Sequence, residues 1–383
     1  MASIAAADVV LLIDNHDHQR SDTLWEFNRR AATTVKGGRT NQGKSYIHAL
    51  FKIFPLTGIS FPEQYNDGNT YAHPRTADLI STFWHRWTEF QEIEIQTTIL
   101  SCLASSSALH TQTADFVNMI GKGLDNYTTN ARGDIGSLVR IEATKAAGAI
   151  WGGSTLDGIK LDAFKKLFGK VLRAASEKLD RVRFEGQKAV ACALKRRTDI
   201  VPNTNSIFES FSTSSKEYFL FLLELQTSDW LAHGSLFRDD AVEWAREFME
   251  GYITSADTGS EDLIRASRAA LAEFCEMGHT SIVYDSLIRI LETRPNEDRV
   301  AIPCLEALSF LFDWGYLQKM NRNFDDLNRL VKNAMRRKGK IGIRRLEACI
   351  KVFAGLNDPD ALEQLARLVL HRFPTIRNAA IDE

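Results

Sequence analysis

Apolar residues recur along most of the chain at the spacing of amphipathic helices, and strand-like alternation is almost absent outside Val9 to Ile13. Between Asp240 and Tyr252 they fall on one helical stripe, with Asp240 expected as the N-cap. A second stripe runs from Phe324 to Met335 and ends beside cations and a glycine, which suit a helix C-terminus. A third helix is expected to begin at Asp358-Pro359. Its predicted apolar stripe is Leu362, Leu365, Ala366, Val369 and Leu370. The pattern predicts an all-α fold.

The predicted helices also repeat loosely, because an apolar residue followed by arginine recurs ahead of small or apolar positions. The five occurrences are Val139-Arg140, Val182-Arg183, Ile264-Arg265, Ile343-Arg344 and Ile376-Arg377. Most are separated by about one or two multiples of forty residues, the period of HEAT and armadillo helix pairs. We therefore predict an α-solenoid of HEAT/armadillo-like antiparallel helix pairs, with each of these arginines on the second helix of a pair. An irregular helical bundle is the alternative.

The predicted domain organisation follows from this repeat. Residues 1–20 are expected to form a flexible N-terminal segment, and residues 21–383 a HEAT-like helical repeat domain. A sub-boundary is predicted at 199–214, where loop-forming residues cluster.

Composition and charge exclude several classes of function. The chain carries 47 Lys and Arg against 49 Asp and Glu, so it lacks the basic excess that nucleic-acid binding needs. The five cysteines show no metal or disulfide spacing, which favours a reducing, cytoplasmic compartment. The apolar run at Val9 to Ile13 is too short to span a membrane. We expect no cofactor, no metal, no nucleic acid and no membrane span.

One sequence motif would instead predict a nucleotide-binding protein. Gly38 to Ser45 matches the phosphate-binding P-loop pattern, in which Lys44 would reach the phosphates and Ser45 would hold magnesium. A P-loop follows a buried strand, whereas residues 25–37 resemble an amphipathic helix running into a loop. A nucleotide-binding protein therefore remains an alternative. The predicted α-solenoid, by contrast, requires that no parallel sheet lies under residues 30–45. No nucleophile with an evident base appears, so a non-catalytic protein is expected.

Residues 123–140, 175–183 and 370–377 are three segments that resemble the family of tubulin-folding cofactor D. Residues 123–140 are similar to its signature D-Y-T-x-D-x-R-G-D-V-G-S-W-V-R, with Asn130 in place of aspartate and Leu138 in place of tryptophan. Residues 175–183 and 370–377 resemble its A-S-E-K-I-D-R-x-R and C-H-R-F-P-x-I-R stretches in the same order. The first hundred residues match only in helical character.

The resemblance implies a HEAT-repeat chaperone that captures β-tubulin. Such a protein cooperates with tubulin cofactors C and E and an Arl2-type small GTPase in assembling and disassembling the αβ-tubulin heterodimer, and it can assist GTPase activation within that complex. It would be cytoplasmic and associated with the microtubule cytoskeleton. The family's proteins are much longer, so this chain is expected to be a C-terminal region, and a last helix beginning only at Pro374 fits a cut. A HEAT-repeat scaffold of unrelated trafficking function is the alternative.

The loop before Arg140 is the main candidate for partner binding. Gly133 and Gly136 are expected to permit a tight loop, and Asp134 to cap the next helix. Tyr127, Arg132 and Asp134 are expected to lie at the surface. The alternative is a polar ladder between repeats, formed by Asp134, Arg140, Asp180 and Arg183. The cations at 336–338 suit either a solvated helix end or an acidic partner. The predicted partner-binding residues are Tyr127, Thr128, Arg132, Gly133, Asp134, Arg140, Lys178, Arg181, Arg336, Arg337 and Lys338.

Overall fold

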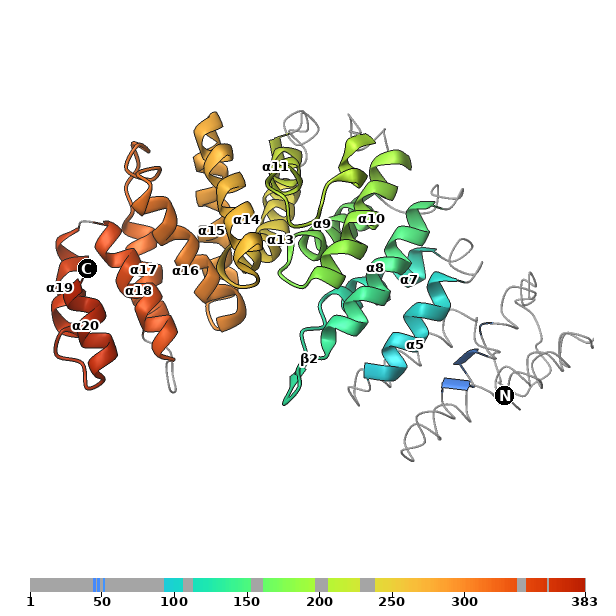
Figure 1. Cartoon of the computed structure of the whole chain (residues 1–383), viewed down its shortest axis with the longest axis horizontal. Helices are drawn as coiled ribbons and strands as arrows, with labels where there is room; N and C mark the ends of the chain where they lie inside the picture. Colours follow the sequence, from blue (N-terminus) through green and yellow to red (C-terminus); the bar gives the residue numbers. More distant parts are fainter. Residues whose placement is uncertain are drawn as a thin grey trace, which may run out of the picture. The chain divides into compact units, whose positions relative to one another are not determined.

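A computed structural model describes residues 44–45, 47–48, 51, 93–105, 113–152, 161–196, 206–227, 238–335, 342–356 and 358–382. Helices make up almost all of this part of the chain, which confirms the all-α prediction (Figure 1). The α-helices are α5 (Ile93–Ala104), α7 (Thr113–Leu124), α8 (Gly136–Gly152), α9 (Leu161–Ser176), α10 (Asp180–Arg196), α11 (Lys216–Glu224), α13 (Arg238–Asp257), α14 (Glu261–Phe274), α15 (Thr280–Thr293), α16 (Asp298–Asp313), α17 (Asp325–Met335), α18 (Ile343–Leu356), α19 (Pro359–Leu368) and α20 (Pro374–Asp382). Shorter elements are the 3₁₀ turns η2 (Ser206–Ser210) and η3 (Leu225–Thr227), the π-type turn η4 (Cys275–His279), and the strands β1 (Thr129–Asn130) and β2 (Gly133–Asp134).

The helices pack mainly against helices nearby in the sequence, as the repeat prediction requires. The chain divides into two compact units, residues 1–171 with 185–201 and residues 172–184 with 202–383. In the first unit, α8 covers α5 and α7. In the second, α13 packs against α14, α15 and α16, and α18 packs against α16, α17, α19 and α20. Each unit is therefore built as a helical solenoid. The predicted boundaries at residues 20 and 199–214 stay predictions.

Two of the three helices outlined from the pattern begin where expected. Helix α17 starts at Asp325 and ends at Met335. At the start of α19, the Asp358 carboxylate accepts a hydrogen bond from the Ala361 amide at 3.2 Å, and Pro359 is the first helical residue. The start of α13 was placed wrongly, because this helix begins at Arg238 and Asp240 lies inside its first turn.

The predicted apolar stripe of α19 was also partly wrong. The buried face is formed by Ala361, Leu365 and Leu368, which follow one another at helical spacing of four and three residues. Leu362 is 54% exposed, because it lies one residue, or about 100°, away from this face. Leu370 is exposed because the helix ends at Leu368.

All five apolar–arginine pairs lie on the second helix of a pair, namely on α8, α10, α14, α18 and α20. Each of these five helices carries an arginine that donates a hydrogen bond to a backbone carbonyl at or just after the C-terminal end of the preceding helix. The donor and acceptor pairs are Arg140 to Asn126 at 2.7 Å, Arg183 to Glu177 at 2.9 Å, Arg268 to Ala256 at 2.8 Å, Arg345 to Ala334 at 3.1 Å and Arg377 to His371 at 3.0 Å. We call this contact the arginine clamp. It satisfies carbonyls that have no partner within their own helix and places a cation at the negative end of its dipole.

In two pairs the clamp residue differs from the predicted one. Arg268 replaces Arg265, which is exposed and pairs with Glu261 on its own helix at 3.1 Å. Arg345 replaces Arg344, because one residue of rotation turns Arg344 outward, where it pairs with Asp257 at 2.6 Å. Arg345 is almost fully buried.

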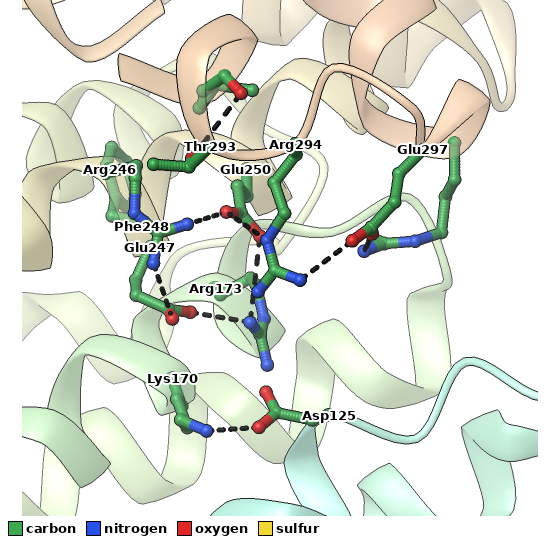
Figure 2. A network of polar contacts seen from close by, with 12 residues as sticks. Asp125, Lys170, Arg173, Arg246, Glu247, Phe248, Glu250, Thr293, Arg294 and Glu297 are labelled. Carbon is green, nitrogen blue, oxygen red and sulfur yellow. Dashed lines mark hydrogen bonds and ion pairs between the residues drawn. The ribbon is translucent and has the colours of Figure 1, made fainter. Parts of the chain in front are cut away.

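A buried ion network ties α9 to α13 within the second unit (Figure 2). Arg173 of α9 contacts Glu247 at 2.6 Å, and Arg246 contacts both Glu247, at 3.0 Å, and Glu250. Arg294, after α15, lies 3.5 Å from Glu250. Burial raises the pKa of the Glu250 carboxyl, and the neighbouring arginines oppose this shift. Removing one member would leave a buried charge without compensation.

The backbones of α9 and α13 also approach closely beside this network. A Cβ atom at Gly251 would lie 2.1 Å from the Arg173 carbonyl oxygen, so only glycine fits there. The Ser255 hydroxyl donates to the Ser176 carbonyl at 2.7 Å. Together these contacts fix the register of α9 on α13.

We predict that the clamp stabilises the fold far more than an exposed arginine two residues away does. Arg183 donates to the Thr213 carbonyl at 2.7 Å and to the Glu177 carbonyl at 2.9 Å, whereas Arg181 is exposed. Arg183→Met should lower the free energy of unfolding by about 3 kcal/mol, because a buried and a half-buried carbonyl lose a charged donor. Arg181→Met should change it by less than about 0.5 kcal/mol. Urea denaturation followed by circular dichroism measures both, and equal effects would contradict the assignment.

The cysteines provide a second prediction. All five are free, and burial raises the pKa of Cys102 and Cys349 to about 12 and of Cys275 to about 11. Cys304 is buried as well, and Cys192 is the one with partial exposure. Because the thiolate is the reactive form, Cys192 should react first with a thiol reagent near pH 8. The other four should react only in denaturant. Mass spectrometry of the labelled protein tests this, and rapid native labelling of Cys349 would contradict it.

Candidate interaction surfaces

The loop between α7 and α8 is a short β-hairpin with an exposed tip. Thr129 pairs with Asp134 and Asn130 with Gly133 in antiparallel register, so Ala131 and Arg132 form the turn. Gly133 has a positive φ of 111°, which favours glycine. The Asn130 side-chain oxygen accepts from the Arg132 amide at 2.8 Å. Residues 129–133 are all exposed, as expected for Arg132.

The base of the hairpin is tightly packed. A Cβ atom at Gly136 would lie 2.5 Å from the Asn126 carbonyl oxygen, so no side chain fits there. The Gly136 amide donates to the Thr128 carbonyl at 2.9 Å. The Asp134 carboxylate accepts from the Ser137 amide at 3.0 Å, which confirms its predicted role as the cap of α8.

The Arg140 side chain holds the base of the hairpin together. Its guanidinium donates to the Asn126 carbonyl at 2.7 Å and to the Asp134 carboxylate at 2.8 and 3.2 Å. It also lies over the Tyr127 ring, 4.1 Å from the centroid, and is 1% exposed. Arg140 therefore connects the end of α7, the hairpin and the start of α8.

This arrangement corrects part of the surface prediction. Tyr127 and Asp134 are half-buried, and both contact Arg140 instead of projecting, because a buried guanidinium requires partners around it.

The polar-ladder alternative is supported only for Arg183, which reaches the next segment by donating to the Thr213 carbonyl at 2.7 Å and to the Ser214 hydroxyl at 2.9 Å. The Asp134–Arg140 and Asp180–Arg183 ion pairs are both local to the start of one second helix, so neither links two repeats.

The remaining predicted residues lie elsewhere. Lys178 and Arg181 are exposed at the turn between α9 and α10. Residues 336–338 fall outside the described residues, as do residues 38–43 of the P-loop pattern. Lys44 and Ser45 are helical, and Lys44 pairs with Glu94 of α5 at 2.5 Å.

A groove in the second unit is a further surface, which the sequence analysis missed. It has a volume of about 510 Å³. Its lining residues are Arg265, Arg268, Ala269, Glu306, Ser309, Phe310, Asp313, Trp314 and Lys351, from α14, α16 and α18. We call it the α14–α16 groove. The available signal was the alternation of the aromatics Phe310, Phe312, Trp314 and Tyr316 around the end of α16, because residues two apart do not share one helical face.

Neither a metal centre nor a membrane span is evident in the described ranges. Within them, no three His, Cys, Asp or Glu side chains come together in a way that could hold a metal ion. Likewise, no helix in this part of the chain has the length and apolar character needed to cross a membrane.

The fold and these surfaces define a helical-repeat protein whose distinctive chemistry lies on its surface. Residues 165–342, a little under half of the chain, match the family model described as tubulin folding cofactor D C terminal. This region of the chain is therefore similar to the C-terminal part of tubulin folding cofactor D. A comparison with curated proteins finds no match.

We predict that Asp134 and Arg132 play separable roles in the hairpin. Asp134→Ala removes both the cap of α8 and the carboxylate partner of Arg140, so it should lower the free energy of unfolding by about 2–3 kcal/mol. Arg132→Ala should leave it unchanged within about 0.5 kcal/mol, because the side chain is exposed. Chemical denaturation of both variants is the measurement. A strongly destabilised Arg132→Ala would show that the tip is also structural.

Proposed function

We propose that the protein is a non-catalytic tubulin-folding chaperone scaffold. In this proposal it binds β-tubulin and cooperates with tubulin cofactors C and E and an Arl2-type small GTPase in αβ-tubulin assembly and disassembly. The family match supports a role in tubulin folding. The helical-repeat fold supports partner binding through extended surfaces, since solenoids expose large faces. The proposed location is the cytoplasm, at the microtubule cytoskeleton.

The observation that best supports a binding role is the contrast between the tip and the base of the hairpin. The tip exposes Arg132 and polar groups, while the base is fixed by Arg140, Asp134 and the close approach at Gly136. A preorganised loop loses little conformational entropy on binding. We propose that Arg132 and Gly133 at the tip, together with Thr128 at the base, contact tubulin or the GTPase. In this proposal Tyr127, Asp134 and Arg140 position the tip.

Lys178 and Arg181 are proposed as a second contact, together with the cations at 336–338. Both side chains are exposed at the α9–α10 turn. By contrast, the ion pair of Lys44 with Glu94 favours the scaffold over the nucleotide-binding alternative, because a P-loop lysine must be available to phosphate.

The test compares two exposed arginines by charge reversal. Arg132→Glu should weaken binding of purified αβ-tubulin, or of an Arl2-type GTPase, about tenfold or more, if the tip is an interface hot spot. Arg329→Glu on α17 is the matched control, because Arg329 is also exposed and pairs only locally, with Asp326 at 2.9 Å. Biolayer interferometry measures the affinities, and circular dichroism checks that both variants are folded.

Unchanged affinity of Arg132→Glu for both partners would overturn the assignment of the hairpin. If the unaltered chain binds neither αβ-tubulin nor the GTPase, the proposed function itself fails for this chain.

A further inference from the structure

The α14–α16 groove combines an aromatic base with an exposed tryptophan. Phe310 is buried in its base, and the Arg268 guanidinium lies over its ring at 5.8 Å. Trp314, at the C-cap of α16, is 59% exposed and lies 5.4 Å from Phe310 between ring centroids. Tyr316 also stacks with Trp314, at 6.4 Å between ring centroids and with an interplanar angle of 13°. Two rings thus contact the indole, while much of it remains open to a ligand.

Only some of the charged side chains around these rings are paired with an opposite charge. Lys351 and Glu306 neutralise each other through contacts of 2.9 and 3.2 Å. Asp313 accepts a hydrogen bond from the Ser309 hydroxyl at 3.4 Å but keeps its negative charge, so the two arginines of the lining face one carboxylate without a cationic partner among the described residues. The two arginines of α14 therefore supply most of the remaining capacity for a charged ligand.

Both arginines can take a carboxylate without breaking a buried contact. Arg268 uses its Nε to hold the Ala256 carbonyl, and among the described residues its terminal nitrogens have no hydrogen-bond partner. Arg265 pairs with Glu261 and Asp262 at 3.1 and 3.6 Å, but all three side chains are strongly exposed, so these pairs are weak and easily exchanged. The guanidinium is well suited to bidentate carboxylate binding.

We propose that the α14–α16 groove binds an acidic peptide segment in which a bulky apolar residue is flanked by glutamate or aspartate. The carboxylates contact Arg265 and Arg268, and the apolar side chain lies against Trp314 and Phe310. A volume of about 510 Å³ accommodates a few side chains of such a segment. Exposed tryptophan and arginine are also the residue types most enriched in binding hot spots. The inference goes beyond the proposed function, because the groove is a separate surface from the hairpin and its ligand is defined by chemistry alone.

The experiment uses three fluorescein-labelled peptides that differ only in charge. The first has leucine flanked on both sides by glutamates, and the other two have glutamine or lysine at those positions. Fluorescence anisotropy against the full chain should show at least tenfold tighter binding of the glutamate peptide than of either other peptide. Added salt should weaken this binding, because the contacts with exposed arginines are screened.

Two pairs of variants locate the site. Arg265→Gln and Trp314→Ala should each weaken binding of the glutamate peptide about tenfold, because each removes a contact of hot-spot type. The matched controls are Arg289→Gln and Leu362→Ala, which alter similarly exposed side chains on α15 and α19, outside the groove. These should leave the affinity unchanged. All four positions are largely exposed, so the variants should remain folded, as circular dichroism will verify.

Several results would overturn the proposal. They are equal binding of the glutamine peptide, tighter binding of the lysine peptide, no binding of the glutamate peptide in the millimolar range, or equal losses in the groove variants and their controls. Because αβ-tubulin and the GTPase are not used, these outcomes are independent of the test of the proposed function.

Discussion

The arginine clamp is the contact shared by five helix pairs, and the turn in each of them depends on it. A helix ends with carbonyls that lack partners, and in a repeat array these ends are packed against the next helix instead of open water. An arginine of the second helix reaches back and donates to one of them. The guanidinium has five donors in a fixed plane, so it can also hold a nearby carboxylate, as Arg140 holds Asp134. One side chain thereby fixes both the turn and the angle at which the second helix returns.

The ion network around Arg173 has a different role. Burying several charges together is costly, and the same volume filled with apolar residues would often be at least as stable. What the network supplies is specificity, because Arg173 finds its carboxylate partners only when α9 lies in one register on α13. The close approach at Gly251 imposes the same register sterically. Both lie within the region that matches the cofactor family.

The two candidate surfaces follow from these structural contacts. At the hairpin, the clamp of α8 anchors the base, and the tip is left to present Arg132. In the α14–α16 groove, the clamp residue Arg268 keeps its terminal nitrogens for another partner. A residue type selected for helix packing thus also supplies binding chemistry, since one arginine carries more donors than the clamp uses.

The sequence by itself determined the helical fold class, the pairing of helices and the caps at Asp358 and Asp134, because periodicity and capping depend on residues only a few positions apart. It also placed the apolar–arginine pairs on second helices. Only the tertiary structure decided which arginine forms the clamp, since Arg344 and Arg345 differ by about 100° of helical rotation and the partner lies on another helix. The same holds for Tyr127, whose ring is covered by Arg140, and for the α14–α16 groove, whose lining residues come from three helices. Contacts between residues distant in sequence leave no local pattern, and the packing of the helices alone sets them.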